Sequence, residues 1–196
     1  MKSFLIAFLS LVMVNSANLW AHGETPGEVV IGKGAEFAVH RIDRLVTLKR
    51  IDPVFVSNLK AVTGERINEN GARFRFLGVT EPDAQNQVSA ITILMDAQGK
   101  VLSHSVTGTV TPANPVSWPS KNAASLIEEA LHFVVDSGER FPEIKPFYLG
   151  LTSIGLEPLK DKGELLAHLK VTSDDDKRTL HIYLKTDGTY VSHTVQ

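Results

Sequence analysis

The chain has 196 residues, a formal net charge of −2 at pH 7 and no cysteine. Without cysteine there are no disulfides, no thiolate metal sites and no lipid attached through a cysteine. The near-neutral charge gives no electrostatic reason to expect binding to nucleic acid or to an anionic membrane surface. A chain of this length can bury a substantial core, as one domain or as two small ones.

The first residues have the pattern of an export signal. Lys2 precedes an uninterrupted apolar run over residues 4–14, and small and polar residues follow it. The run is shorter than the ~20 residues that a membrane-spanning helix needs. We expect residues 1–21 to be a signal peptide that is cleaved after Ala21, with cleavage after Ala17 as the alternative. The mature protein is therefore expected to be secreted or periplasmic.

The segment after the signal is expected to hold a mobile arm and then a first α+β unit. Residues 22–34 are rich in glycine and polar residues, which is typical of an arm. Within 35–110, Asp52-Pro53 has the pattern of a helix cap and a first-turn proline, so a short second helix is expected there. Strand-like runs and tight turns follow. The first helix is predicted by apolar residues at the spacing of one helix face: Ala38, Ile42, Leu45 and Val46.

Residues 111–120 separate this unit from the next. They contain Pro112, Pro115 and Pro119, which favour a short, stiff connector over a helix or a central strand. Trp118 lies inside this connector. Its side chain is expected either to fill the seam between the two units or to contact a partner.

Residues 121–196 are expected to form a second α+β unit. Ser120 is the expected cap of its helix, and Gly138 is expected just past the end. Near the C-terminus, Asp187-Gly188 follows an alternating run and is typical of a tight β-hairpin. The helix itself is predicted by one apolar stripe: Ala123, Leu126, Ile127, Ala130, Leu131 and Val134.

The two units align with each other, so we predict tandem repeats. The segment from Ile51 matches the segment from Ile144 in apolar residues, glycines and turns, and both units close on a Ser-His pair. The predicted fold is α+β, with each repeat a helix, or two, packed on a four-stranded antiparallel meander. On one strand the alignment equates Phe76 with His168, and it places Leu165 and Ala167 at the positions of Arg73 and Arg75.

The closing hairpins resemble those of PepSY-type domains. The first runs over residues 91–102 and turns at Asp96-Ala97-Gln98-Gly99, and the second turns at Asp187-Gly188. The tandem helix-plus-four-strand plan is similar to that of the secreted β-lactamase inhibitor protein family, which has cysteines that this chain lacks. The resemblance implies an exported, non-catalytic module that binds or inhibits a protein. It carries over no site residues.

No motif in the sequence points to an enzyme. A G-x-S-x-G elbow, a phosphate-binding loop and an H-E-x-x-H pair are all missing. Three consecutive aspartates, Asp174, Asp175 and Asp176, lack the alternating ligands and the downstream glutamate of an EF-hand loop. We interpret them as a solvated turn, and no cofactor is expected.

The leading prediction is a binding or inhibitory module that acts through its sheet surfaces on another exported protein or a peptide. Arg73 and Arg75 alternate with Phe74 and Phe76, so this strand has one cationic and one aromatic face, and either face could be the buried one. The candidate anchors for the partner are Arg73, Arg75, Trp118 and Tyr190.

The alternative prediction is a periplasmic metal-binding protein. His104 and His193 occupy the same place in the two repeats, which would suit one shared metal site or a matching pair of contacts. A hydrogen-bonded histidine at the edge of the core is the other interpretation of each. Cleavage after Ala21 would also let the α-amine and imidazole of His22 chelate Cu(II).

Overall fold

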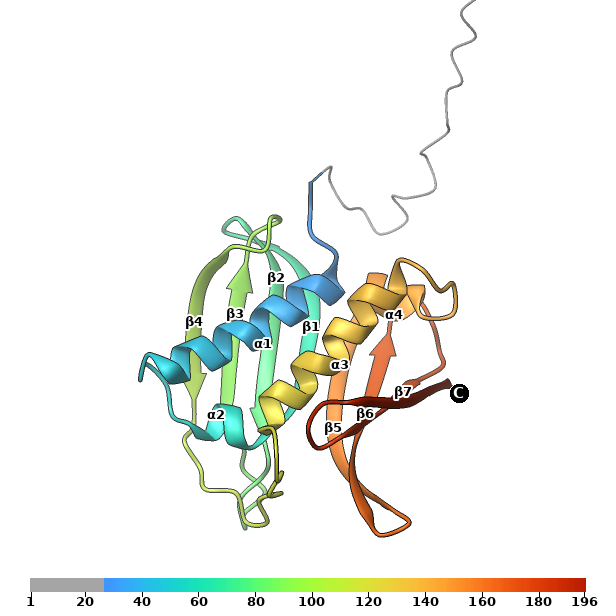
Figure 1. Ribbon diagram of the computed structural model, residues 1–196. Coiled ribbons are helices and arrows are strands. Elements are labelled where there is room, and N and C mark those ends of the chain that lie inside the picture. Colours follow the sequence, from blue (N-terminus) through green and yellow to red (C-terminus); the bar gives the residue numbers. More distant parts are fainter. Residues whose placement is uncertain (1–26) are drawn as a thin grey trace, which may run out of the picture.

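The computed structural model describes residues 27–196, and it forms one antiparallel sheet with the helices on one face (Figure 1). The predicted signal peptide and His22 lie outside these residues. The helices are α1 (Ile31–Thr47), α2 (Val54–Ser57), α3 (Ala123–Gly138) and α4 (Lys145–Leu149). The strands are β1 (Leu59–Glu69), β2 (Ala72–Thr80), β3 (Ala90–Met95), β4 (Val101–Thr107), β5 (Leu151–Asp161), β6 (Glu164–Ser173), β7 (Leu180–Lys185) and β8 (Tyr190–Val195).

The predicted α+β class is confirmed, and the eight strands belong to a single sheet. Its order is β4-β3-β2-β1-β5-β6-β7-β8, and every neighbouring pair is antiparallel. The sheet is continuous because β1 and β5 pair with each other, with Val62 opposite Ile154. Through this pairing, β1 and β5 hydrogen-bond to each other along edges that would be open if each half formed a separate sheet.

The arm predicted over 22–34 is wrong at its C-terminal end, because α1 begins at Ile31. Gly32 and Gly34 belong to the first turn of this helix and let it approach its neighbours closely. A Cβ on Gly32 would lie 2.7 Å from the carbonyl oxygen of Tyr148, and one on Gly34 would lie 2.8 Å from Cζ of Phe76. These glycines therefore serve close packing rather than chain mobility.

The apolar stripe predicted for α3 is confirmed, since all six of its residues are buried. The helix ends differ from the prediction. Asn122 rather than Ser120 caps the N-terminus, and its side-chain oxygen accepts a hydrogen bond of 2.8 Å from the amide of Ser125. Gly138 is the last helical residue and packs closely against Tyr148 of α4, where a side chain would not fit.

The face of the sheet beneath the helices forms the core. Along β2, Phe74 and Phe76 are buried on this face, whereas Arg73 and Arg75 are half-buried on the other. The same alternation runs through β3, where Ile91 and Ile93 are buried. Alternation of this kind follows from the two-residue period of a strand. The cationic face of β2 is therefore the open one.

The sequence alignment was wrong by one residue along β6. In β1–β2, Gly64 pairs with Phe76, while at the corresponding place in β5–β6, Leu156 pairs with Leu169. His168 pairs with Glu157 on the open face and so matches Arg75, not Phe76. The register of β1–β2 is irregular between Arg66 and Glu69, and a shift of one residue turns every following side chain to the other face.

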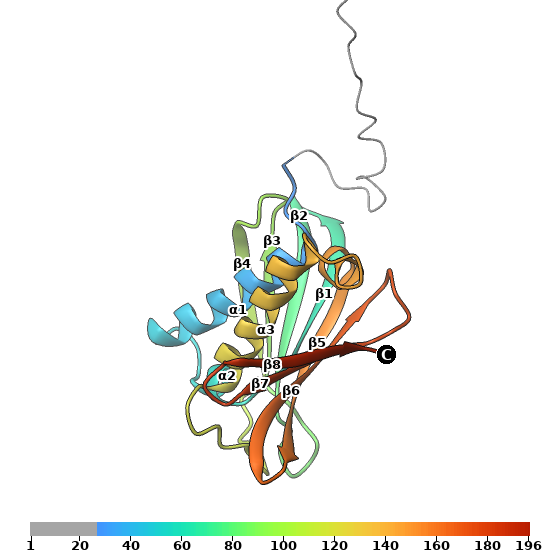
Figure 2. The same ribbon diagram turned by 45° about the vertical axis from the view of Figure 1, so that its right-hand side comes forward.

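The outer strands of the second half turn steeply away from the rest of the sheet. Figure 2 shows β7 and β8 crossing the view at a large angle to β1–β4, so that β8 passes close to α3. Phe133 of α3 stacks on Tyr190 of β8, with ring centroids 4.9 Å apart. Between residues 27 and 196, no helix is both long enough and apolar enough to cross a bilayer.

Candidate functional site

Within residues 27–196, no helix or strand covers the second face of the sheet, which we call the open face (Figure 1). It contains a hollow of about 500 Å³ over the central strands β1, β2 and β3. The lining combines hydroxyl, charged and aliphatic groups, which is the mixture found at protein interfaces rather than in a core. The lining residues are Thr63, Gly64, Glu65, Arg75, Leu77 and Thr92.

Ion pairs hold the two predicted arginine anchors on the open face. Arg75 donates to Glu65 on the neighbouring strand β1 at 2.7 Å and to Glu69 at 3.1 Å. Arg73 lies 3.6 Å from Glu28, whose side chain is almost completely buried. Because these carboxylates fix both guanidinium groups, the arginines present a fixed surface and lose little side-chain entropy when a partner binds.

An aromatic and imidazole cluster occupies the second half of the open face. The rings of His168 and Tyr183 are nearly parallel, with centroids 4.8 Å apart, and Nε2 of His168 lies 2.9 Å from Nδ1 of His181. Burial, and then the neighbouring His181, lower the pKa of His168, so its neutral form is favoured. One imidazole of the pair donates a hydrogen bond to the other.

Sequence analysis missed this cluster because its register for β6 was wrong. The available signal was the alternation His181-x-Tyr183 on β7, which places both side chains on one face. Glu157 lies across from His168 on β5 and accepts a hydrogen bond of 2.7 Å from Lys170. That hydrogen bond lowers the pKa of Glu157, so its carboxylate remains charged.

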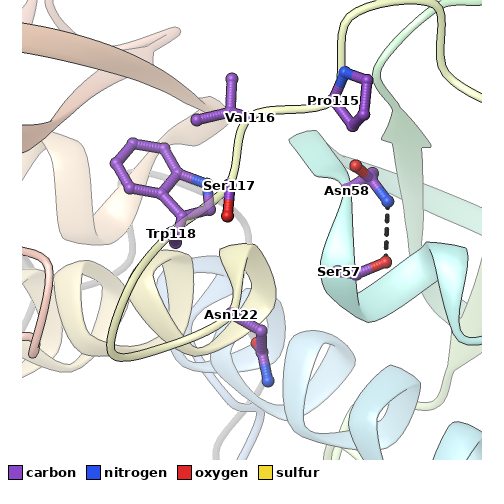
Figure 3. Close-up of a pocket in the computed structure, with 7 residues that line it drawn as sticks. All are labelled: Ser57, Asn58, Pro115, Val116, Ser117, Trp118 and Asn122. Atoms are coloured by element: carbon purple, nitrogen blue, oxygen red, sulfur yellow. Dashed lines mark hydrogen bonds between the residues drawn. The ribbon is translucent and has the colours of Figure 1, made fainter.

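Trp118 lies away from the open face, at the seam between the two halves (Figure 3). Its indole packs partly against the core and lines a pocket of about 320 Å³ between the end of α2 and the start of α3. Asn58, beside it, donates a hydrogen bond of 2.7 Å to the hydroxyl of Ser57. Trp118 therefore fills the seam, one of the two roles predicted for it, and the exposed part of its ring borders the pocket.

Tyr190 also lies outside the open face. It pairs with Leu184 on the helix side of the sheet, where its ring stacks on Phe133. Its hydroxyl oxygen is 2.6 Å from Nδ1 of His193, and burial raises the pKa of Tyr190. Of the four predicted anchors, the structure thus brings only Arg73 and Arg75 together.

The structure separates the two histidines of the metal-binding alternative. His104 is on β4 and His193 is on β8, and these strands are the two opposite edges of the sheet. One metal ion bound by both within a single chain is therefore excluded. Among the residues that the structure describes, no three histidine, aspartate or glutamate side chains converge as a metal site would require.

A further group of histidines and carboxylates lies between α1 and α3. Nδ1 of His40 is 3.3 Å from Glu128, and Nδ1 of His132 is 3.2 Å from Glu36. The signal in the sequence was a glutamate four residues before a histidine in each helix, a spacing that places both on one face. These pairs, in which the histidines are exposed and the glutamates are partly buried, link the two helices across their outer surface.

Comparison with known proteins gives no assignment. No known protein family matches the chain, and neither the curated proteins nor the solved structures contain a match.

Proposed function

We propose that the protein is exported and binds another exported protein or a peptide through the open face of its sheet, without catalysing a reaction. The observation that carries this proposal is the uncovered face with its hollow of about 500 Å³ and its fixed arginines. A stable interface takes ~800 Å² from each partner. Before β7 and β8 turn away, the six strands from β4 to β6 span ~24 Å at a spacing of ~4.8 Å, and ten residues of strand extend ~33 Å, so this part of the face is large enough for a contact of that size.

Two parts of the open face supply different kinds of contact. Around the hollow, Leu77 offers apolar area beside the charged Arg75, a residue type that is enriched at interface hot spots. In the second half, Tyr183 and the paired imidazoles of His168 and His181 offer flat aromatic surface with polar atoms. Together they favour a partner with both apolar and hydrogen-bonding groups.

The element order supports an origin by duplication, which we include in the proposal. Each half has two helices followed by four antiparallel strands, and the halves meet where Val62 pairs with Ile154. The resemblance of the hairpins to PepSY-type domains, and of the tandem plan to the secreted β-lactamase inhibitor protein family, favours a binding or inhibitory role over an enzymatic one.

The proposal is tested by two matched substitutions in purified protein used to capture partners from the exported fraction of its host. Thr63→Lys introduces a charge into the hollow, and Thr47→Lys introduces the same charge at the exposed end of α1. Both threonines are exposed, so both variants are expected to fold, and a thermal melt checks this.

We expect the wild type and Thr47→Lys to retain the same specific protein or peptide, and Thr63→Lys to lose it. Retention of that molecule by Thr63→Lys, or the absence of any specific molecule, would argue against binding through the open face.

A further inference from the structure

Strand β4, at one edge of the sheet, has unusually exposed side chains. After Val101, every residue of β4 is exposed, including Leu102 at 45% and Val106 at 40%. The strand contains no lysine, arginine, aspartate, glutamate or proline, the residues by which natural edge strands avoid pairing with other chains. The ladder with β3 is irregular only at the start of β4, between Val101 and Ser103, so the outer backbone groups from Ser103 to Thr107 form an unprotected template for another strand.

The sequence of β4 reads nearly the same, in chemical terms, in both directions. Around His104 the order is aliphatic, serine, histidine, serine, aliphatic, from Leu102 to Val106. If two copies of β4 pair antiparallel with His104 on the twofold axis, Leu102 of each lies opposite Val106 of the other. Ser103 likewise lies opposite Ser105. Each cross-strand pair then joins side chains of the same kind.

The faces of the sheet agree with this pairing. Val106 and His104 lie opposite Ile91 and Ile93 on the helix side, and Ser103 and Ser105 lie on the open face. A twofold pair of this kind keeps the helices of both copies on one side of a continuous sheet. The C-terminal end of α1 projects past β4 in Figure 1, and the twofold relation places the two helix ends on opposite sides of the axis. Leu48, which caps that end and is 55% exposed, adds apolar area beside the partner.

The other edge of the sheet is less suited to this role. β8 has a similar order of residue types around His193, but Tyr190 and His193 are already engaged by Phe133 of α3. His193 and Val195 are only half-exposed, whereas the corresponding residues of β4 are exposed. Of the two edge strands, only β4 combines an uncharged sequence with side chains that are exposed at every position after Val101.

We propose that the protein forms a twofold dimer in which the β4 strands of two copies pair antiparallel about His104. This inference goes beyond the proposed function and joins two open faces into one longer surface. The contact is small, so a dissociation constant in the micromolar range, ~1–100 µM, is expected. The measurement is sedimentation of the purified protein over a concentration series that spans this range.

Charge substitutions test the register. In the pairing, Leu102→Glu or Val106→Lys places a charge opposite an aliphatic side chain at two symmetric places, and we expect each to weaken the dimer by ~10-fold or more. The double variant Leu102→Glu/Val106→Lys places each new carboxylate opposite a new ammonium, so dimerisation returns toward the wild-type level. The matched control, Val191→Glu on β8, leaves the dimer intact.

A wild type that stays monomeric throughout the series would overturn the proposal. So would a dimer that the β4 variants leave unchanged, a double variant weaker than both single variants, or assemblies that keep growing with concentration, which would indicate head-to-tail pairing of β4 with β8. Thermal melts of each variant show that loss of the dimer is not loss of the fold. The outcome does not depend on a binding partner, so this test is separate from that of the proposed function.

Discussion

Gly64 offers a direct test of which face of the sheet is the core. It lies on β1 opposite Phe76, and an added Cβ would lie 2.9 Å from Cε1 and 3.1 Å from Cδ1 of that ring. The ring has little room to move, because its side chain is 1% exposed and Gly34 of α1 lies against the ring so closely that a Cβ there would be 2.8 Å from Cζ. Gly64→Ala must therefore displace packed groups.

We expect Gly64→Ala to lower the free energy of unfolding by about 2 kcal/mol, in the usual range for overpacking. For a domain of this size that is a fall in Tm of about 4–8 °C. Gly155→Ala is the matched control on the neighbouring strand β5, because a Cβ at Gly155 meets nothing within 4 Å. That substitution is expected to be neutral or to stabilise by up to about 1 kcal/mol, since alanine is less costly than glycine within a strand.

The assay is chemical unfolding monitored by circular dichroism on both variants and the wild type. A Gly64→Ala protein as stable as Gly155→Ala would refute the placement of Phe76 beneath α1, and with it the assignment of the open face. Replacing Phe76 with leucine in the Gly64→Ala background provides a second check. The two changes should be non-additive, because the smaller side chain removes the clash.

Three further predictions concern other parts of the molecule. Burial lowers the pKa of His168 in the folded protein, so the unfolded chain takes up this proton first as the pH falls below about 6.5. The wild type therefore loses stability as the pH falls, and its Tm should drop between about pH 7.5 and about pH 5.5. His168→Gln should show a smaller drop in Tm over the same range; a drop equal to that of the wild type would contradict this. Asn122→Ala removes the cap of α3 and should cost about 1 kcal/mol in chemical unfolding, whereas Ser120→Ala should cost almost nothing. At protein concentrations below those at which the chain dimerises, Cu(II) should shift the Tm of His104→Ala and of the wild type equally, because among the described residues of one chain His104 belongs to no group of three possible metal ligands; a shift lost only in His104→Ala would contradict this.

The sequence predicted the elements better than their arrangement. The stripe of α3 depends on local periodicity, and the hairpin turn at Asp187-Gly188 depends on a positive φ angle, which the structure shows at Gly188. The pairing of β1 with β5 joins segments about 90 residues apart, and no local pattern encodes it.

The site was harder to predict than the fold. Arg73 and Arg75 were found because they alternate with aromatic residues, but the face they occupy depends on what covers the sheet. The cluster around His168 was missed because one irregular register in β1 moves the alignment by a residue. Tyr190 lies away from the open face, since the steep turn of β8 brings it against α3, a tertiary contact that its sequence neighbours do not indicate.

The proposal of a partner on the open face is tested most directly by photo-cross-linking in living cells. A photoreactive amino acid replaces Leu77, in the hollow, or His132, which is exposed on the outer surface of α3. We predict an adduct of one defined mass from the Leu77 position and none of that mass from the His132 position. Adducts from neither position, or the same adduct from both, would contradict binding through the open face.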